Sequence, residues 1–102
     1  MQHYHAQHAK CMTKSGKRDE LIHHLIEHIE PLKHASGCIH YLIGTTDEPD
    51  VVWISELWAS KEAKDAFALN PESAKVLEKL MPLVAAMTER TAMTIVGGIG
   101  IP

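Results

Sequence analysis

A carboxylate and an indole separated by one residue are the side chains of this sequence best suited to chemistry on an aromatic molecule. They are Glu56 and Trp58, in a run over residues 51–58 whose β-branched and aromatic residues predict a strand. Side chains alternate along a strand, so Glu56 lies on one face between Ile54 and Trp58. A carboxylate in this position must be paired, protonated or directed into a cavity, because burying it unpaired is costly.

Two interpretations of this pair are open. In the first, a pocket lies between the sheet and the helices, where the indole is a flat wall for an aromatic ligand and the carboxylate is a base or hydrogen-bond acceptor. In the second, Trp58 fills the core and Glu56 pairs with a neighbouring strand or a helix N-terminus. Composition alone favours the second interpretation.

The chain has eight histidines, and two of them have a spacing that can present both imidazoles to one metal ion. His24 and His28 are four residues apart on a predicted helix. No cysteine or carboxylate at a fixed spacing completes a ligand set, so we expect no metal site. His28 falls beside the apolar stripe of its helix and is interpreted as a residue at the boundary between core and solvent.

Two cysteines, Cys11 and Cys38, are too few for a disulfide framework. No Cys-His-Asn pattern can be assembled around Cys38, which favours a structural thiol over a nucleophile. No signal peptide precedes the two cysteines, and no apolar run approaches the length that spans a bilayer. We therefore expect a cytoplasmic protein with both thiols reduced.

The hydrophobic periodicity and the turn signals predict seven elements. They are a strand over 4–13, an amphipathic helix over 18–33, strands over 38–44 and 51–58, helices over 60–68 and from 70, and a strand over 92–96. Ser60 and Asn70 are good N-caps, and Pro71 suits the first position of a helix. The apolar stripe of the last helix is expected to continue, with a kink near Pro82, as far as Met87.

The order β-α-β-β-α-α-β predicts an α+β fold, the ferredoxin-like split β-α-β, with helices on one face of an antiparallel four-stranded sheet. The first strand is expected to neighbour the third and fourth, with the second at the edge. Such a sheet has a second face that needs a cover. We expect a homodimer whose sheets pack together and bury Trp53 and Leu57 or the residues opposite them.

A chain of 102 residues with 45% apolar residues is expected to form a single domain over residues 1–102. The formal net charge of −3 gives no electrostatic case for a nucleic-acid or membrane partner.

Several short stretches resemble the antibiotic biosynthesis monooxygenase family, which includes quinol monooxygenases and related small dimeric proteins. The matching residues are Lys14-Ser15-Gly16-Lys17, Ser36-Gly37-Cys38, Tyr41, and Glu56-Leu57-Trp58-Ala59-Ser60-Lys61-Glu62-Ala63. The resemblance covers residues 8–96 in order and implies a dimeric α+β barrel. For the characterised enzymes of the family it also implies oxygenation of electron-rich phenols or quinols without metal, flavin or haem.

The resemblance and the residues together suggest a cofactor-independent monooxygenase acting on a quinol or phenol. Glu56 or His40 would handle the proton, and Trp58, Phe67 and Tyr41 would contact the aromatic substrate. Quinol monooxygenases often carry a histidine nine residues after the motif tryptophan, where this chain has Phe67. His40 could substitute for it, the substrate could differ, or the chain could be a non-catalytic binding or structural homodimer. Haem handling is a third possibility.

Overall fold

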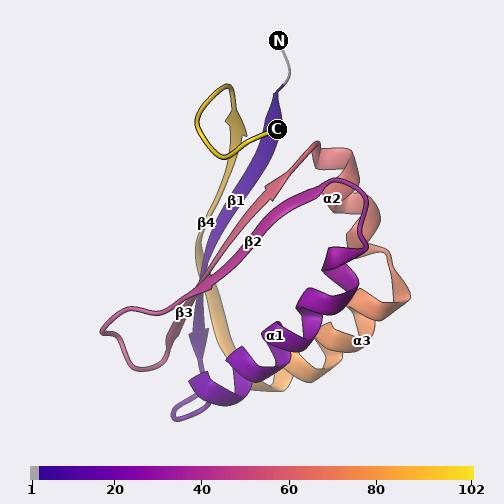
Figure 1. The fold of residues 1–102 in the computed structure, drawn as a ribbon. Helices are drawn as coiled ribbons and strands as arrows, with labels where there is room; N and C mark the ends of the chain where they lie inside the picture. The colour runs from indigo at the N-terminus through magenta and orange to yellow at the C-terminus, as the bar shows by residue number, and fades with distance from the viewer. Residues whose placement is uncertain (1–2) are drawn as a thin grey trace.

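One antiparallel sheet of four strands, in the order β2-β3-β1-β4, forms the framework of the computed structural model (Figure 1). The structure describes residues 3–102. The strands are β1 (Tyr4–Thr13), β2 (Cys38–Gly44), β3 (Val51–Trp58) and β4 (Val84–Ile95). The predicted order is confirmed: β3 is central, β1 neighbours β3 and β4, and β2 lies at an edge.

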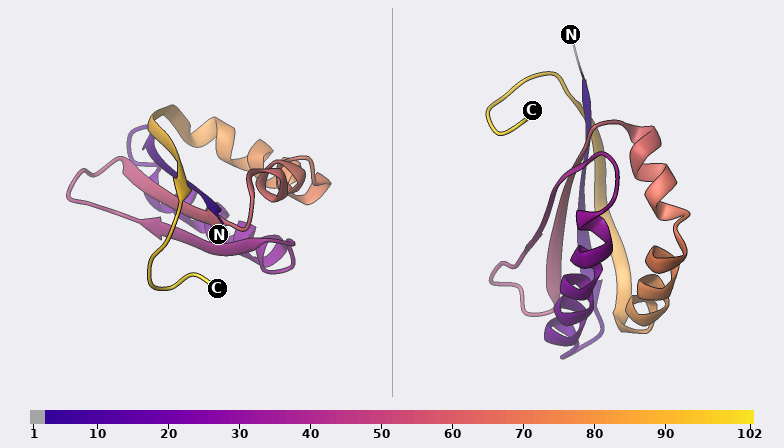
Figure 2. Two further views of the ribbon diagram at one scale, coloured as in Figure 1. Left: turned by 90° about the horizontal axis from the view of Figure 1, so that it is seen from above. Right: turned by 45° about the vertical axis from the view of Figure 1, so that its right-hand side comes forward.

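Three helices cover one face of this sheet (Figures 1 and 2). They are α1 (Arg18–Lys33), α2 (Lys61–Ala68) and α3 (Pro71–Leu80). The predicted caps are confirmed, since Ser60 Oγ accepts a hydrogen bond from the Ala63 amide at 3.1 Å and Asn70 Oδ1 accepts one from the Glu72 amide at 2.8 Å. The ferredoxin-like α+β fold predicted from the element order is the fold observed.

The end of the last helix differs from the sequence prediction. α3 stops at Leu80, one 3₁₀ turn spans Met81–Leu83, and β4 begins at Val84 rather than at residue 92. Pro82 has no amide hydrogen to continue the helical ladder, and from Val84 onward the chain pairs with β1 instead. The apolar spacing that suggested a longer helix therefore belongs partly to a strand.

The core lies between the helices and the helix-facing side of the sheet. One cluster joins Cys11, Leu21, Leu25, Val52, Ile54 and Leu83, and a second joins Leu32, Trp58 and Phe67. The even-numbered residues of β3 from Val52 to Trp58 thus face the helices, as the alternation predicted.

The opposite face of the sheet carries no helix. Residues 97–102 curl over one end of it, where the Tyr4 hydroxyl donates a hydrogen bond to the Pro102 carbonyl at 2.7 Å (Figure 2). Elsewhere apolar side chains are open to solvent, with exposed fractions of 63% for Leu42, 40% for Met12 and 37% for Met93. We call this side of the sheet the open face.

Candidate active site

A cavity of about 430 Å³ lies between the helix-facing side of the sheet and the helices α1 and α3. Its apolar lining includes Leu21, Leu25, Ile54, Leu77, Leu80, Met81, Val84 and Met87. Its polar and ionisable side chains are Cys11, His28, Tyr41 and Arg90, and no carboxylate lines it. A mostly apolar cavity of this size with a few convergent polar groups is typical of a small-molecule site.

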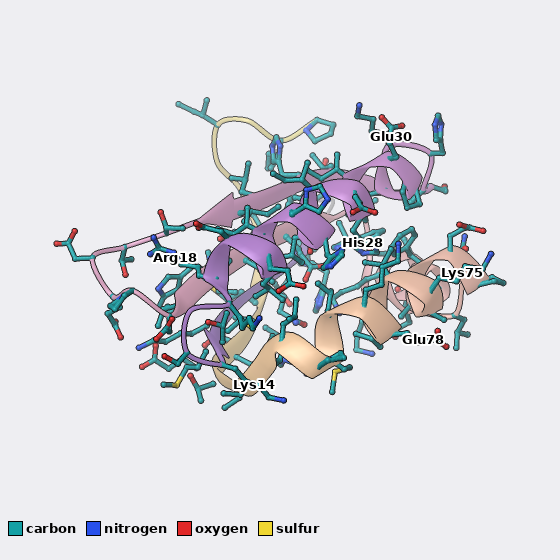
Figure 3. The ribbon with its side chains drawn as sticks, turned by 90° about the horizontal axis from the view of Figure 1, so that it is seen from below. Lys14, Arg18, His28, Glu30, Lys75 and Glu78 are labelled. Carbon is teal, nitrogen blue, oxygen red and sulfur yellow. The ribbon has the colours of Figure 1, made fainter. Side chains whose placement is uncertain are left out.

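His28 brings an imidazole to this cavity from the side of α1 that faces α3 (Figure 3). Burial lowers the pKa of His28 below its ordinary value, so the ring is neutral at neutral pH. Its Nδ1 atom is buried and has no hydrogen-bond partner among residues 3–102. A neutral imidazole can accept a proton, as a general base must.

Tyr41 of β2 stands beside His28 in the cavity wall. The two rings meet edge to face, with centroids 5.9 Å apart and an interplanar angle of 75°. Burial, with a smaller contribution from the Glu56 carboxylate, raises the pKa of Tyr41 above its ordinary value. The phenol therefore keeps its proton and can act as a hydrogen-bond donor to a bound molecule.

Arg90 supplies the one permanent charge among the residues that line the cavity. It is exposed, so it lies at the solvent end of the lining, whereas Leu21 and Leu25 are buried at the inner end. Cys11 is also buried, and burial raises the pKa of its thiol, which makes it a poor nucleophile.

The sequence-predicted pair Glu56 and Trp58 interacts directly. Trp58 Nε1 donates a hydrogen bond to Glu56 Oε1 at 3.1 Å, and Trp58 is only 1% exposed. The Trp58 and Phe67 rings pack with centroids 5.7 Å apart, and Phe67 in turn lies 5.4 Å from the His28 ring. Trp58 therefore reaches the cavity only through Phe67 and His28, and it does not line the cavity.

His40 lies on the open face. Its Nε2 is 2.9 Å from the carbonyl oxygen of Gly100 in the C-terminal tail. His40 and Glu56 both border a separate hollow of about 230 Å³ between the strands and that tail. Phe67 borders a third hollow, beside α2. Of the five side chains assigned to a site from the sequence, Tyr41 alone lines the cavity under α1 and α3.

Sequence reasoning missed His28 and Arg90. A signal for His28 was present, because it continues the stripe of Leu21, Leu25 and Leu32 that α1 buries. A histidine placed on a buried stripe faces the core or a cavity. Arg90 gave no such signal, because the prediction placed no regular element at residue 90.

The fold and the cavity together define a small α+β protein with a mostly apolar cavity against the helix-facing side of its sheet. Comparison with known proteins places this chain in one family. The model of the antibiotic biosynthesis monooxygenase family matches residues 5–79. The chain belongs to this family, as the resemblance of its short stretches predicted.

Solved structures agree with this assignment. A candidate antibiotic biosynthesis monooxygenase of Chloroflexus aurantiacus J-10-fl is 31% identical, with a TM-score of 0.86 over 97% of this chain and 99% of that one. A Shewanella oneidensis protein is 26% identical, with a TM-score of 0.79 over 93% of this chain and 95% of that one. A candidate monooxygenase of Nitrosomonas europaea shares the fold at 14% identity, with a TM-score of 0.79 over 97% and 93%. No protein of curated function matches the chain significantly.

Neither a candidate metal cluster nor a candidate membrane-spanning helix occurs in residues 3–102. No group of three or more His, Cys, Asp or Glu side chains in that range is arranged to hold a metal ion. None of the helices in the same range is long and apolar enough to cross a membrane. Cys11 and Cys38 are both free thiols, as expected.

Proposed function

We propose that this protein is a monooxygenase that oxidises a small phenol or quinol in the cavity under α1 and α3, without a cofactor. The observation that carries the proposal is the pairing of a neutral, half-buried His28 with a protonated Tyr41 in a mostly apolar cavity. Membership of the antibiotic biosynthesis monooxygenase family supports the reaction type.

The reaction begins with loss of the phenolic proton. His28 accepts this proton, and Tyr41 donates a hydrogen bond to the oxygen on which negative charge develops. The resulting anion is electron-rich and passes an electron to dioxygen. One oxygen atom then enters the ring and the other leaves as water. A phenol with a free para position and one dioxygen thus yield one quinone and one water, and a quinol with a free ring position and one dioxygen yield one hydroxyquinone and one water.

The apolar lining contributes by excluding water from the reacting anion. Leucine, isoleucine, valine and methionine side chains make up most of the wall. A low-dielectric surrounding strengthens the hydrogen bond from Tyr41 and protects reactive intermediates from side reactions.

The test is oxygen consumption by the purified, metal-free protein against a panel of quinols and polycyclic phenols. We expect uptake of one dioxygen for each quinone formed, and a loss of about a hundredfold or more in kcat/KM for His28→Gln. No uptake across the panel would contradict the proposal. His34→Gln is the control, since His34 is an exposed histidine at the end of the same helix.

The same assay decides between this proton acceptor and those suggested by the sequence. Glu56→Gln and His40→Ala should leave turnover within about threefold if His28 is the base. Loss of activity in either variant with full activity in His28→Gln would return the proton role to Glu56 or His40. Trp58→Ala is a poor probe, because truncating a core tryptophan costs about 3–5 kcal/mol of stability whatever its role.

The alternative function, a non-catalytic binding dimer, is favoured by the placement of Glu56 and His40 away from the cavity. It predicts that the same phenols bind without oxygen uptake. For either function we propose a homodimer in which a second copy covers the open face, and a cytoplasmic location, which the two free thiols support.

A further inference from the structure

An irregularity in the β1–β4 ladder lies beside the solvent end of the cavity. His8 pairs with Thr91 and Lys10 pairs with Thr88, so the single residue Ala9 faces two residues of β4, Glu89 and Arg90. This arrangement is a β-bulge.

The bulge includes an unusual backbone conformation. Glu89 has a φ of 48°, and it is the only non-glycine residue with positive φ among those that the structure describes. A side chain in this region of φ normally costs stability, and such strain is found mainly where the surrounding structure requires it.

Arg90 lies at the bulge and faces the helix side of the sheet. The partners of Thr88 and Thr91, Lys10 and His8, lie on the open face, so both threonines face that side. Two residues rather than one then separate them, and Arg90 lines the cavity on the helix side. Arg90 precedes Thr91 and therefore lies opposite Ala9, on the helix side of the sheet, and Glu89 is the additional residue of the bulge.

The guanidinium of Arg90 has no partner among residues 3–102. Among residues 3–102, no carboxylate lies within 4.0 Å of it, and it makes no side-chain hydrogen bond. Lys79 of α3, by contrast, has a partner, since its Nζ lies 3.5 Å from Glu27 Oε2. No carboxylate lines the cavity to repel an anion.

We infer that Arg90 is a specificity-determining residue that selects an aromatic substrate bearing a carboxylate. The ring would lie in the apolar interior and the carboxylate would meet the guanidinium fork at the solvent end, where two parallel hydrogen bonds can form. This inference rests on the proposed function, because it uses the same cavity. It adds that the substrate carries a negative charge.

The test compares the binding of gentisate, a quinol with a carboxylate, with that of its methyl ester by isothermal titration calorimetry. For the native chain we expect gentisate to bind about tenfold more tightly than the ester, as a charge-assisted hydrogen bond allows. In Arg90→Gln the two affinities should agree within about threefold, and Arg90→Lys should retain part of the preference. Arg18→Gln is the control, since Arg18 contacts the Glu48 carbonyl outside the cavity.

Equal affinity of the native chain for the two compounds, or no measurable binding of either, would overturn the inference. So would a preference for gentisate that survives in Arg90→Gln, with folding of the variant verified by circular dichroism. Oxygen uptake is scored separately. If gentisate is preferred through Arg90 but no dioxygen is consumed, the inference stands and the proposed monooxygenase activity is contradicted. If dioxygen is consumed but gentisate is not preferred, the proposed activity stands and the inference is contradicted.

Discussion

His28, the proton acceptor in the proposed reaction, links that reaction to the stability of the fold. A base must be unprotonated to act, and burial keeps this imidazole neutral by lowering its pKa. The same burial means that the folded protein resists a proton which the unfolded chain accepts. One residue therefore has an expected pH signature in unfolding and, under the proposed reaction, in activity as well.

We predict that His28 makes the native protein lose stability in mild acid. Its folded-state pKa is below the ordinary value of 6.5, so its contribution to stability is present above pH 6.5 and is lost as pH falls through the folded pKa. Urea unfolding between about pH 7.5 and pH 5 should show a smaller loss for His28→Gln than for the native chain. His34→Gln should lose as much unfolding free energy over this pH range as the native chain. An equal loss in the native chain, His28→Gln and His34→Gln would contradict the prediction.

At the scale of elements, Gly37 is the point where the turn after α1 meets the turn after β3. Its carbonyl accepts a hydrogen bond from the Ala59 amide at 2.7 Å. Its φ is +88°, and a Cβ built there would lie 2.8 Å from the Ala63 Cβ on α2. A glycine is therefore required both by the backbone conformation and by the close approach of α2.

We predict that Gly37→Ala lowers the free energy of unfolding by about 2–4 kcal/mol, the sum of left-handed strain and overpacking. Gly44→Ala is the matched control, because a Cβ added there would meet no atom within 4 Å and its φ is not positive. That variant should stay within about 0.5 kcal/mol of the native chain. Similar midpoints for both variants in urea would show that the close approach to α2 is not needed.

At the scale of the whole molecule, the sheet has one face covered by helices and one face left to solvent. Leu42, Met12 and Met93 are exposed on the open face, and Trp53 and Leu57 are half-buried there. Large exposed apolar side chains on a sheet commonly mark a surface that another chain covers.

We predict that the native chain elutes with the mass of two chains in size-exclusion chromatography with light scattering, and that Leu42→Glu elutes as one. A carboxylate within an apolar interface would have to be buried unpaired, which opposes association. Leu69→Glu is the control, because Leu69 is 85% exposed at the end of α2, away from the open face. A native monomer, or a dimer that survives Leu42→Glu, would contradict this use of the open face.

Most of the fold could be predicted from the sequence, because it depends on local signals. The stripe of α1, the caps Ser60 and Asn70, and the β-branched run of β3 each act through neighbours in the chain. The end of α3 could not be predicted, because Val84 and Met87 fit a helical stripe as well as a strand. Pairing with β1, a contact between distant segments, decides between the two.

The sequence by itself determined the elements, their order, the central place of β3 and the family, since periodicity and short motifs carry that information. Only the tertiary structure decided the site. Whether Glu56 faces a ligand or the Trp58 indole, and whether His28 lines a boundary or a cavity, depends on which side chains from β1, β2, β4 and α3 converge. Convergence is set by packing between segments far apart in the chain, and it is the pairing of β4 with β1 that places Arg90 on the helix side of the sheet.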